Sequence, residues 1–263
     1  MKVNLTVDDK LRLTDAIVAV AREAGSVIMM HYQAGTAVRL KEDASPVTAA
    51  DDAADRLIGE RLAAAAPHIA VISEEAFAGG RRPDIDDLFF LVDPLDGTKE
   101  FLGGNGEFTV NIALIENGVP VLGVVYAPAI SRLFYANGLG QAFERRGDGP
   151  DTPIRARRPP PGGLVVVASR SHRDSETDAY LSTLNIASLT SAGSSLKFCL
   201  IASGEADLYP RFGPTMEWDT AAGHAVLAAA GGCVTQVDGA PFTYGKSASG
   251  FKNPAFVARG YAR

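Results

Sequence analysis

Two stretches in the first quarter of the chain carry helical patterns of apolar residues. Between residues 8 and 33 the apolar positions recur at near-helical spacing, and Thr6 and Asp9 stand in the relation of a capping box. A second stretch, rich in Ala and Leu, runs from 49 to 66 and stops at Pro67, which cannot continue a helical hydrogen-bond ladder. We therefore expect two helices here, the first long and amphipathic.

The middle of the chain is dominated by strand-like patterns. Apolar runs of strand length, rich in β-branched residues, occupy 69–72, 88–92, 109–115, 119–126, 132–135 and 141–143. Asn117-Gly118 and Asn137-Gly138 separate the later runs, and Asn-Gly favours hairpins because both residues tolerate positive φ. The pattern predicts helices packed on a largely antiparallel sheet, with the 88–92 strand ending in a turn at Asp93.

A change in composition marks a boundary in the second half. Residues 146–163 are rich in Gly, Pro and Arg, which is typical of a linker or a long surface loop. Beyond it, strand-like runs alternate with helical ones, as in an α/β unit. The strands are expected at 164–168, 186–189 and 206–209, and the helices at 175–184, 194–202 and 220–230. We divide the chain into two lobes, 1–154 and 155–263.

Composition narrows the function classes. Of 263 residues, 46% are apolar and 21% charged, and 25 Lys and Arg against 31 Asp and Glu give a formal charge of −6. That balance argues against a partner such as duplex nucleic acid, which needs a basic face, but it permits a small phosphate ester. Cys199 and Cys233 have helix-like and strand-like surroundings and are expected to be reduced thiols. With no transmembrane run and no secretory signal, we expect a cytoplasmic protein, and its oligomeric state stays open.

The most informative segment is Asp93-Pro94-Leu95-Asp96-Gly97-Thr98, which follows an apolar strand. Its two carboxylates and the carbonyl of Leu95 can surround hard cations, which prefer oxygen ligands. The amides and hydroxyl of the final Gly-Thr pair can contact a phosphate, particularly if a helix starts there. Taken alone, the segment is more typical of an ordinary Asp/Pro/Gly turn after a strand.

Other acidic residues are also unremarkable when taken singly. Glu74 and Glu75 follow a short strand, where paired acids are usually solvated. Asp219 stands at a predicted helix start, where an aspartate commonly caps the helix, and Thr48 or Asp51 can cap the second helix in the same way. Their order along the chain, however, matches the motifs of a known family, which gives them an interpretation other than capping or solvation.

That ordered set resembles the signatures of the inositol monophosphatase superfamily, a group of Mg²⁺-dependent phosphatases. The matching segments are 48–51, 73–75, 93–98 and 217–223, so the resemblance spans most of the chain. Within the superfamily the chain is most similar to the bacterial CysQ type of 3′(2′),5′-bisphosphate nucleotidase. The segments that carry this closer match are 96–101, 105–113, 169–172, 193–198 and 209–214.

The resemblance implies a fold and a metal site. The fold would be the layered αβαβα sandwich of the sugar-phosphatase type, an α+β or α/β architecture with its site between two lobes. Glu74, Asp93 and the Leu95 carbonyl would hold one Mg²⁺, and Asp93, Asp96 and Asp219 a second, with Asp93 bridging. A weaker third ion would be held through water with help from Glu74. The expected cofactor is therefore Mg²⁺, as two or three ions.

The resemblance also implies catalytic and substrate-binding roles. Thr98, hydrogen-bonded to Asp51, would orient the attacking water alongside Glu74, while Glu75 would support the metal ligands from behind. The reacting phosphate would lie on the amides of Gly97 and Thr98, close to the metal-ligating acids. A second phosphate suits a cationic stretch, because guanidinium can meet phosphate in a bidentate fork. The candidates for these further substrate contacts are Arg170, Lys197, Arg211 and Ser194. The three cations are equally typical of solvated surface charges, and Ser194 is equally typical of a helix cap.

These assignments imply a Li⁺-sensitive phosphomonoesterase of sulfur metabolism. It would hydrolyse the 3′-phosphate of adenosine 3′,5′-bisphosphate, giving AMP and inorganic phosphate, by metal-activated attack of water. An inositol monophosphatase or related sugar phosphatase is the first alternative, because the superfamily shares its catalytic core. The second is a non-catalytic regulator that binds metal or nucleotide. The resemblance to the CysQ type also implies that the chain associates with the inner membrane at most peripherally.

Overall fold

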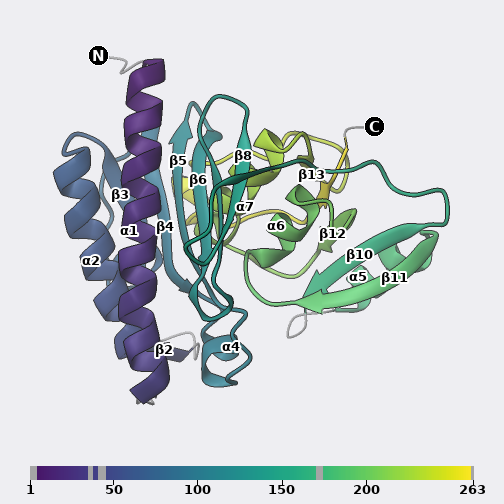
Figure 1. Cartoon of the computed structure of the whole chain (residues 1–263), viewed down its shortest axis with the longest axis horizontal. Helices are drawn as coiled ribbons and strands as arrows, with labels where there is room; N and C mark the ends of the chain where they lie inside the picture. The colour runs from purple at the N-terminus through teal and green to yellow at the C-terminus, as the bar shows by residue number, and fades with distance from the viewer. Residues whose placement is uncertain (1–4, 35–37, 41–45, 170–173, 262–263) are drawn as a thin grey trace.

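A computed structural model describes residues 5–34, 38–40, 46–169 and 174–261, arranged as five layers (Figure 1). Two long helices cover one face of a seven-stranded sheet, and two inner helices cover its other face. A five-stranded sheet and a further helix complete the stack. The expected αβαβα layering is confirmed.

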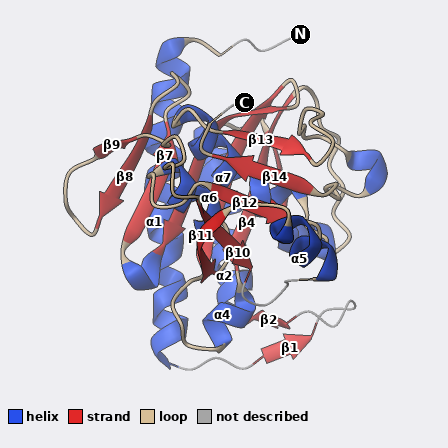
Figure 2. Ribbon diagram, turned by 90° about the vertical axis from the view of Figure 1, so that its right-hand side faces the viewer, coloured by secondary structure: helices blue, strands red, loops and turns tan. Residues whose placement is uncertain are grey.

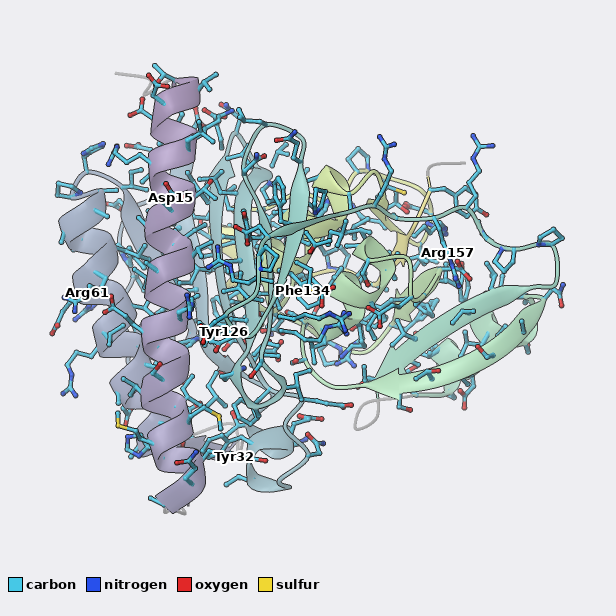
Figure 3. The ribbon with its side chains drawn as sticks, in the orientation of Figure 1. Asp15, Tyr32, Arg61, Tyr126, Phe134 and Arg157 are labelled. Atoms are coloured by element: carbon cyan, nitrogen blue, oxygen red, sulfur yellow. The ribbon has the colours of Figure 1, made fainter. Side chains whose placement is uncertain are left out.

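The outer layer consists of α1 (Val7–Ala34) and α2 (Ala49–Ala65). In α1 the buried residues Leu13, Ile17, Ala24 and Ile28 recur at helical spacing and face the sheet. The predicted capping box at its start is present, since the amides of Thr6 and Asp9 each donate to the other residue's side chain. Tyr126 of the sheet lies against α1 (Figure 3), where an added Cβ on Gly25 would come within 2.4 Å of its ring.

The larger sheet has the strand order β3-β4-β5-β6-β7-β8-β9. The pair β3 and β4 is parallel and every other pair antiparallel, so the expectation of a largely antiparallel sheet is confirmed. The strands are β3 (Ala70–Ser73), β4 (Leu88–Asp96), β5 (Thr109–Glu116), β6 (Val119–Ala127), β7 (Arg132–Ala136), β8 (Ala142–Arg146) and β9 (Thr152–Ile154).

Two turns differ in detail from the prediction. Strand β4 does not end at residue 92: it bulges over two residues after Asp93 and pairs again at Asp96, opposite Thr109, so the turn expected in the segment 93–98 comes only at Gly97. The hairpin at Asn117-Gly118 has both residues at positive φ, as expected. At Asn137 the connection is five residues long because its side chain accepts from the amide of Leu139 and forms a local turn.

The inner layer consists of α6 (Leu196–Ala202) and α7 (Glu217–Ala229). Helix α7 packs across β4, β5, β6 and β7, and α6 packs on α7 and on the smaller sheet. Gly123 in β6 allows this close approach, since an added Cβ would lie 2.7 Å from the carbonyl oxygen of Ala222. The two sheets therefore share one buried apolar layer.

The smaller sheet has the order β11-β10-β12-β14-β13, parallel among the first three strands and antiparallel thereafter. Helix α5 (Ser175–Ser182) covers its outer face through Leu181 (Figure 2). The strands are β10 (Leu164–Ser169), β11 (Ile186–Ala192), β12 (Leu208–Arg211), β13 (Cys233–Gln236) and β14 (Phe256–Arg259).

Short elements complete the fold. The strands β1 (Val38–Leu40) and β2 (Pro46–Thr48) pair with each other, and single turns form the 3₁₀ helices η1 (Pro128–Ile130) and η2 (Ser247–Ser249). Helices α3 (Glu74–Ala78) and α4 (Thr98–Leu102) each follow a strand of the larger sheet. Among the described residues, no helix combines the length and the hydrophobicity needed to cross a bilayer. The division into lobes at residues 154 and 155 stays a prediction.

Candidate active site

The register of β3 and β4 brings the first two acidic residues together. Ser73 pairs with Val92 in this parallel ladder, so Glu74 and Asp93, the next residue of each segment, lie at the same end of the two strands. Carboxylate oxygens of these two residues and of Asp219 all lie within 4.8 Å of one another. Asp96 lines the same cavity.

The bulge in β4 shapes the edge of the sheet. The amide of Leu95 donates to Asp93 Oδ1 at 3.1 Å, which orients that carboxylate, and Gly97 then turns the chain at φ +89° into helix α4. A residue with a Cβ would be strained at that angle. We call residues 74 and 93–98 the sheet wall of the site.

Thr98, at the start of α4, lies close to the start of α2. Its Oγ1 is 3.4 Å from Asp51 Oδ1 and 3.4 Å from the carbonyl oxygen of Leu95. Asp51 is buried, and its Oδ2 accepts from the amide and the hydroxyl of Thr48, which completes the capping box of α2. The expected contact between Thr98 and Asp51 is thus present, with Asp51 behind the wall.

Asp219 arrives from the other side of the site on α7. It is the third residue of the helix, and its Oδ2 accepts from the amide of Met216 at 2.8 Å, so the side chain caps the helix while facing the cavity. The helix begins at Glu217, three residues before the predicted start, because this cap satisfies an amide that would otherwise lack a partner.

The acidic cluster is electrostatically unfavourable without a cation. Burial raises the pKa of Asp219 well above its usual range, and the charges of Asp96 and Glu74 add to the increase. Burial also raises the pKa of Asp96, although Lys197 and a hydrogen bond from Asn111 oppose the shift. A bound cation would remove this penalty, and oxygen donors of this kind match Mg²⁺.

The cavity, of about 330 Å³, also has a cationic side. Lys197 and Arg211 are both buried and both line it, as does Ser194. We call Ser194, Lys197, Arg211 and Asp219 the far wall. The predicted site residues line the cavity with three exceptions: Asp51 lies behind Thr98, Glu75 is not part of the lining, and Arg170 lies outside the described residues.

Backbone carbonyls hold the two cations in place. Lys197 Nζ donates to the carbonyl oxygens of Ala192 and Ser194, at 3.2 and 2.6 Å, and Arg211 donates to those of Gly213 and Pro214, at 3.2 and 3.0 Å. Burial lowers the pKa of Lys197 to about 8, although the charge of Asp96 opposes the shift. Lys197 and Arg211 are therefore buried side chains of the cavity lining and are not solvated surface charges.

Asn111, to which we assigned no role in the site, joins its two walls together with Ser195. Asn111 Nδ2 donates to Asp96 Oδ2 at 3.2 Å and to Ser195 Oγ at 2.9 Å, and Ser195 Oγ donates to the carbonyl oxygen of Asp219 at 2.7 Å. Asn111 is the one amide side chain in the apolar run 109–115, and that isolation was the available signal.

Comparisons with known proteins agree with this geometry. Residues 9–261 match the model of the inositol monophosphatase family. A protein of Shigella flexneri named 3′(2′),5′-bisphosphate nucleotidase CysQ is 51% identical over 248 residues, covering 93% of this chain and 98% of the relative. Its namesake in Escherichia coli K12 is 50% identical over the same shares. The crystal structure of CysQ from Bacteroides thetaiotaomicron, 36% identical, superposes with a TM-score of 0.77, covering 96% of this chain and 98% of that one.

Proposed function

The chain belongs to the inositol monophosphatase family, and we propose that it is a 3′(2′),5′-bisphosphate nucleotidase. The observation that carries the proposal is the identity of about half to nucleotidases of that name, maintained over 93% of the chain. The cavity supports it, since an acidic cluster suited to metal faces two buried cations suited to phosphate. Its substrate would be a small nucleotide such as adenosine 3′,5′-bisphosphate, with AMP and phosphate as products.

The acidic residues would hold the metal. Glu74, Asp93, Asp219 and the carbonyl of Leu95 offer hard oxygen donors, and Asp96 adds another in the same cavity. When bound, Mg²⁺ supplies Lewis-acid activation of water and neutralises charge on the phosphate. We propose two or three ions, as the resemblance to the superfamily implies.

Thr98 would orient the attacking water. Both groups near its hydroxyl, Asp51 Oδ1 and the Leu95 carbonyl, are acceptors, so the hydroxyl proton points toward them. The lone pairs of Thr98 Oγ1 are then directed to accept a hydrogen from the water, with Glu74 on the same wall as a second acceptor. Asp51 would contribute to catalysis by accepting the hydrogen bond that orients the Thr98 hydroxyl.

The substrate would lie across the cavity. The reacting phosphate would rest against Gly97 and Thr98 at the start of α4, close to the acids and their metal. Lys197 and Arg211 would meet the non-reacting phosphate on the far wall, with Ser194 beside them. Arg170 stays a candidate for the same phosphate on the sequence alone.

A substrate panel tests the proposal. Phosphate release is measured with Mg²⁺ on adenosine 3′,5′-bisphosphate, inositol 1-phosphate and fructose 1,6-bisphosphate at equal concentrations, with and without Li⁺. We expect Li⁺-sensitive release that favours the nucleotide. Preference for inositol 1-phosphate, which has a single phosphate, would leave the metal chemistry and overturn the phosphate role of Lys197 and Arg211. Preference for fructose 1,6-bisphosphate, which also carries a second phosphate, would overturn the nucleotide as substrate, and no release from any compound would favour a non-catalytic regulator.

A further inference from the structure

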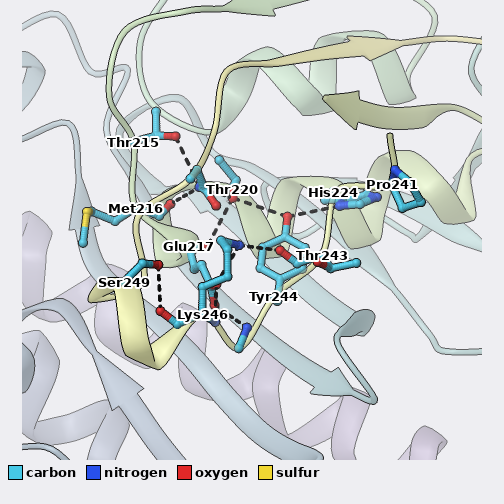
Figure 4. Close-up of polar contacts among 12 residues, drawn as sticks. Thr215, Met216, Glu217, Thr220, His224, Pro241, Thr243, Tyr244, Lys246 and Ser249 are labelled. Atoms are coloured by element: carbon cyan, nitrogen blue, oxygen red, sulfur yellow. Dashed lines mark hydrogen bonds and ion pairs between the residues drawn. The ribbon is translucent and has the colours of Figure 1, made fainter. Parts of the chain in front are cut away.

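Residues 244–253, which we call the clamp segment, contact the start of α7 at many points. Glu217, the first residue of α7, is fully buried, and both of its carboxylate oxygens are bound by this segment (Figure 4). Its Oε2 accepts from the amide of Gly245 at 2.7 Å, and its Oε1 accepts from the amide of Lys246 at 2.8 Å and pairs with Lys246 Nζ at 2.7 Å. A buried carboxylate with so many donors fixes the position of the backbone around it.

The same segment binds the turn that precedes α7. Asn253 Nδ2 donates to the carbonyl oxygen of Met216 at 2.7 Å, and the amide of Met216 in turn donates to Asp219 Oδ2 at 2.8 Å. The carbonyl oxygen of Phe251 accepts from the amide of Glu217 at 2.9 Å. The orientation of the Asp219 carboxylate is therefore linked to the clamp segment through one residue.

Phe251 extends the contact to the other side of the site. Its ring lies 5.5 Å from that of Phe77 and 6.1 Å from that of Trp218, and those two rings are 5.3 Å apart. Phe77 is on α3, three residues after Glu74, and Trp218 precedes Asp219. The three rings thus join the short helix that presents one metal-binding acid to the helix that presents another.

The backbone of Phe251 indicates that this arrangement is specific. Its φ is +60°, in the left-handed region that a bulky side chain adopts only at an energetic cost, and the residue is 3% exposed. The surrounding contacts must compensate for this strain, and they include the hydrogen bond from the Phe251 amide to the carbonyl oxygen of Lys246 at 3.0 Å. Strain of this kind persists where it fixes a geometry that function needs.

We propose that Phe251 is a positioning residue for the metal site, holding Glu74 and Asp219 at the separation that binds a divalent cation. The proposal rests on the metal-binding role assigned to those acids under the proposed function. Phe251 touches neither the metal nor the substrate in this scheme, because it acts through the rings of Phe77 and Trp218. In this proposal the clamp segment affects the affinity of the site for a divalent cation, in addition to contributing to the folding of the chain.

The chain contains a single tryptophan, which provides the readout. Mg²⁺ is titrated into the protein without nucleotide, and binding is followed by Trp218 fluorescence and, independently of that ring, by isothermal titration calorimetry. The variant Phe251→Gly removes the ring and keeps a residue suited to φ +60°. We expect its Mg²⁺ dissociation constant to rise about tenfold, with near-normal kcat at saturating Mg²⁺, while Phe251→Tyr retains the wild-type constant.

Two further variants separate positioning from general stability. Phe134→Leu alters another fully buried ring, in β7, and should lower the melting temperature without changing Mg²⁺ affinity. Lys246→Met removes one partner of Glu217 and leaves its two backbone hydrogen bonds, so it should fold even if Phe251→Gly does not, with Mg²⁺ affinity reduced about threefold.

The results decide between distinct outcomes. Wild-type Mg²⁺ affinity in folded Phe251→Gly, or in Lys246→Met where that alone folds, would overturn the positioning role, as would an equal loss in Phe134→Leu. A wild-type protein that binds no Mg²⁺ would overturn the metal site and the positioning role together. Because the probe is Mg²⁺ alone, preference for another substrate in the panel would refute the nucleotidase proposal and leave the clamp standing.

Discussion

The sheet wall and the far wall of the cavity are built in different ways. In the sheet wall, Glu74 and Asp93 follow paired residues of two parallel strands, so the register of the backbone places them side by side. In the far wall, Lys197, Arg211 and Asp219 come from α6, β12 and α7, and side-chain hydrogen bonds to backbone carbonyls and amides hold each of them. One wall depends on regular register and the other on individual polar contacts.

The difference determines how the walls respond to substitution. A changed ligand on the sheet wall removes a metal donor and leaves the register intact, so the effect on activity should be large and the effect on folding small. A changed contact on the far wall displaces a neighbouring group, so the loss of activity should be smaller and should vary with the contact that is removed. Four substitutions test this contrast.

The largest effect is expected for Asp93→Asn on the sheet wall. The change removes a charged oxygen from the acidic cluster, and loss of one group that stabilises transition-state charge commonly lowers kcat by about 10² to 10³, so we expect a loss of roughly 1000-fold. The melting temperature should not fall, because repulsion with Glu74 and Asp219 decreases. Phosphate release and thermal unfolding measure the two quantities, with exposed Asp238→Asn as the matched control. A fully active Asp93→Asn would refute its role as a ligand.

Asn111→Ala should break the link between the walls. Asn111 donates to Asp96 and to Ser195, and loss of such a supporting group typically costs about 10-fold to 100-fold in metal affinity or activity. Asn137→Ala is the control, since that residue is also buried and donates to Gln141 in a loop of the larger sheet. If both variants lost activity only in proportion to their stability, the coupling of the walls through Asn111 would be wrong.

A smaller and more selective effect is expected for Arg211→Gln. Hydrogen bonds to charged groups contribute about 1.5 to 3 kcal/mol, so loss of the guanidinium should raise the KM for adenosine 3′,5′-bisphosphate at least about tenfold. The KM for adenosine 3′-monophosphate should stay unchanged, because it lacks the second phosphate. Arg145→Gln, which affects an ion pair with Asp151 elsewhere, serves as the control. An equal increase in KM for both nucleotides would remove Arg211 from the second-phosphate site.

The contrast between the walls also explains what the sequence predicts. Long periodic elements such as α1 and β5 follow from their apolar spacing, because burial on one face or both sets that spacing. The helices α3 and α4, of five residues each, span little more than one turn, so no apolar position repeats often enough to be recognised in this way. Strand β14 was not predicted, since it lies between β12 and β13 and its pairing is settled by these distant partners, although the surroundings of Cys233 in β13 were strand-like.

The site residues also divide into those that the sequence can place and those that it cannot. Glu74 and Asp93 can be placed near each other from the sequence, since each comes at the end of an apolar run and the two runs form paired strands. The orientation of Lys197 toward the carbonyls of Ala192 and Ser194 depends on how α6 meets the loop before it, which no local pattern encodes. The clamp segment lies about 30 residues from the helix start it supports and carries no motif of its own.

The smallest effect concerns the polar support of α7. His224 is buried with Nδ1 3.1 Å from Tyr244 Oη, which donates to Thr220 Oγ1, and burial lowers the pKa of the imidazole to about 4. The unfolded chain takes up a proton near the ordinary histidine pKa of about 6.5, so His224 leaves stability unaffected above that pH and reduces it as the pH falls toward 4. At pH 5.5 the loss relative to pH 8 should be about 1 kcal/mol.

Urea unfolding of the wild type and of His224→Gln at both pH values measures this loss. Glutamine retains a donor for Tyr244 and does not titrate, so the difference between the two proteins isolates His224 from the other histidines, which both contain. A variant as sensitive to acid as the wild type would mean that His224 is hydrated in solution and that α7 is supported by its apolar contacts with the larger sheet. A flatter profile would instead place a buried polar chain, from His224 through Tyr244 and Thr220 to the carbonyl of Glu217, among the contacts that hold the helix of Asp219 in place.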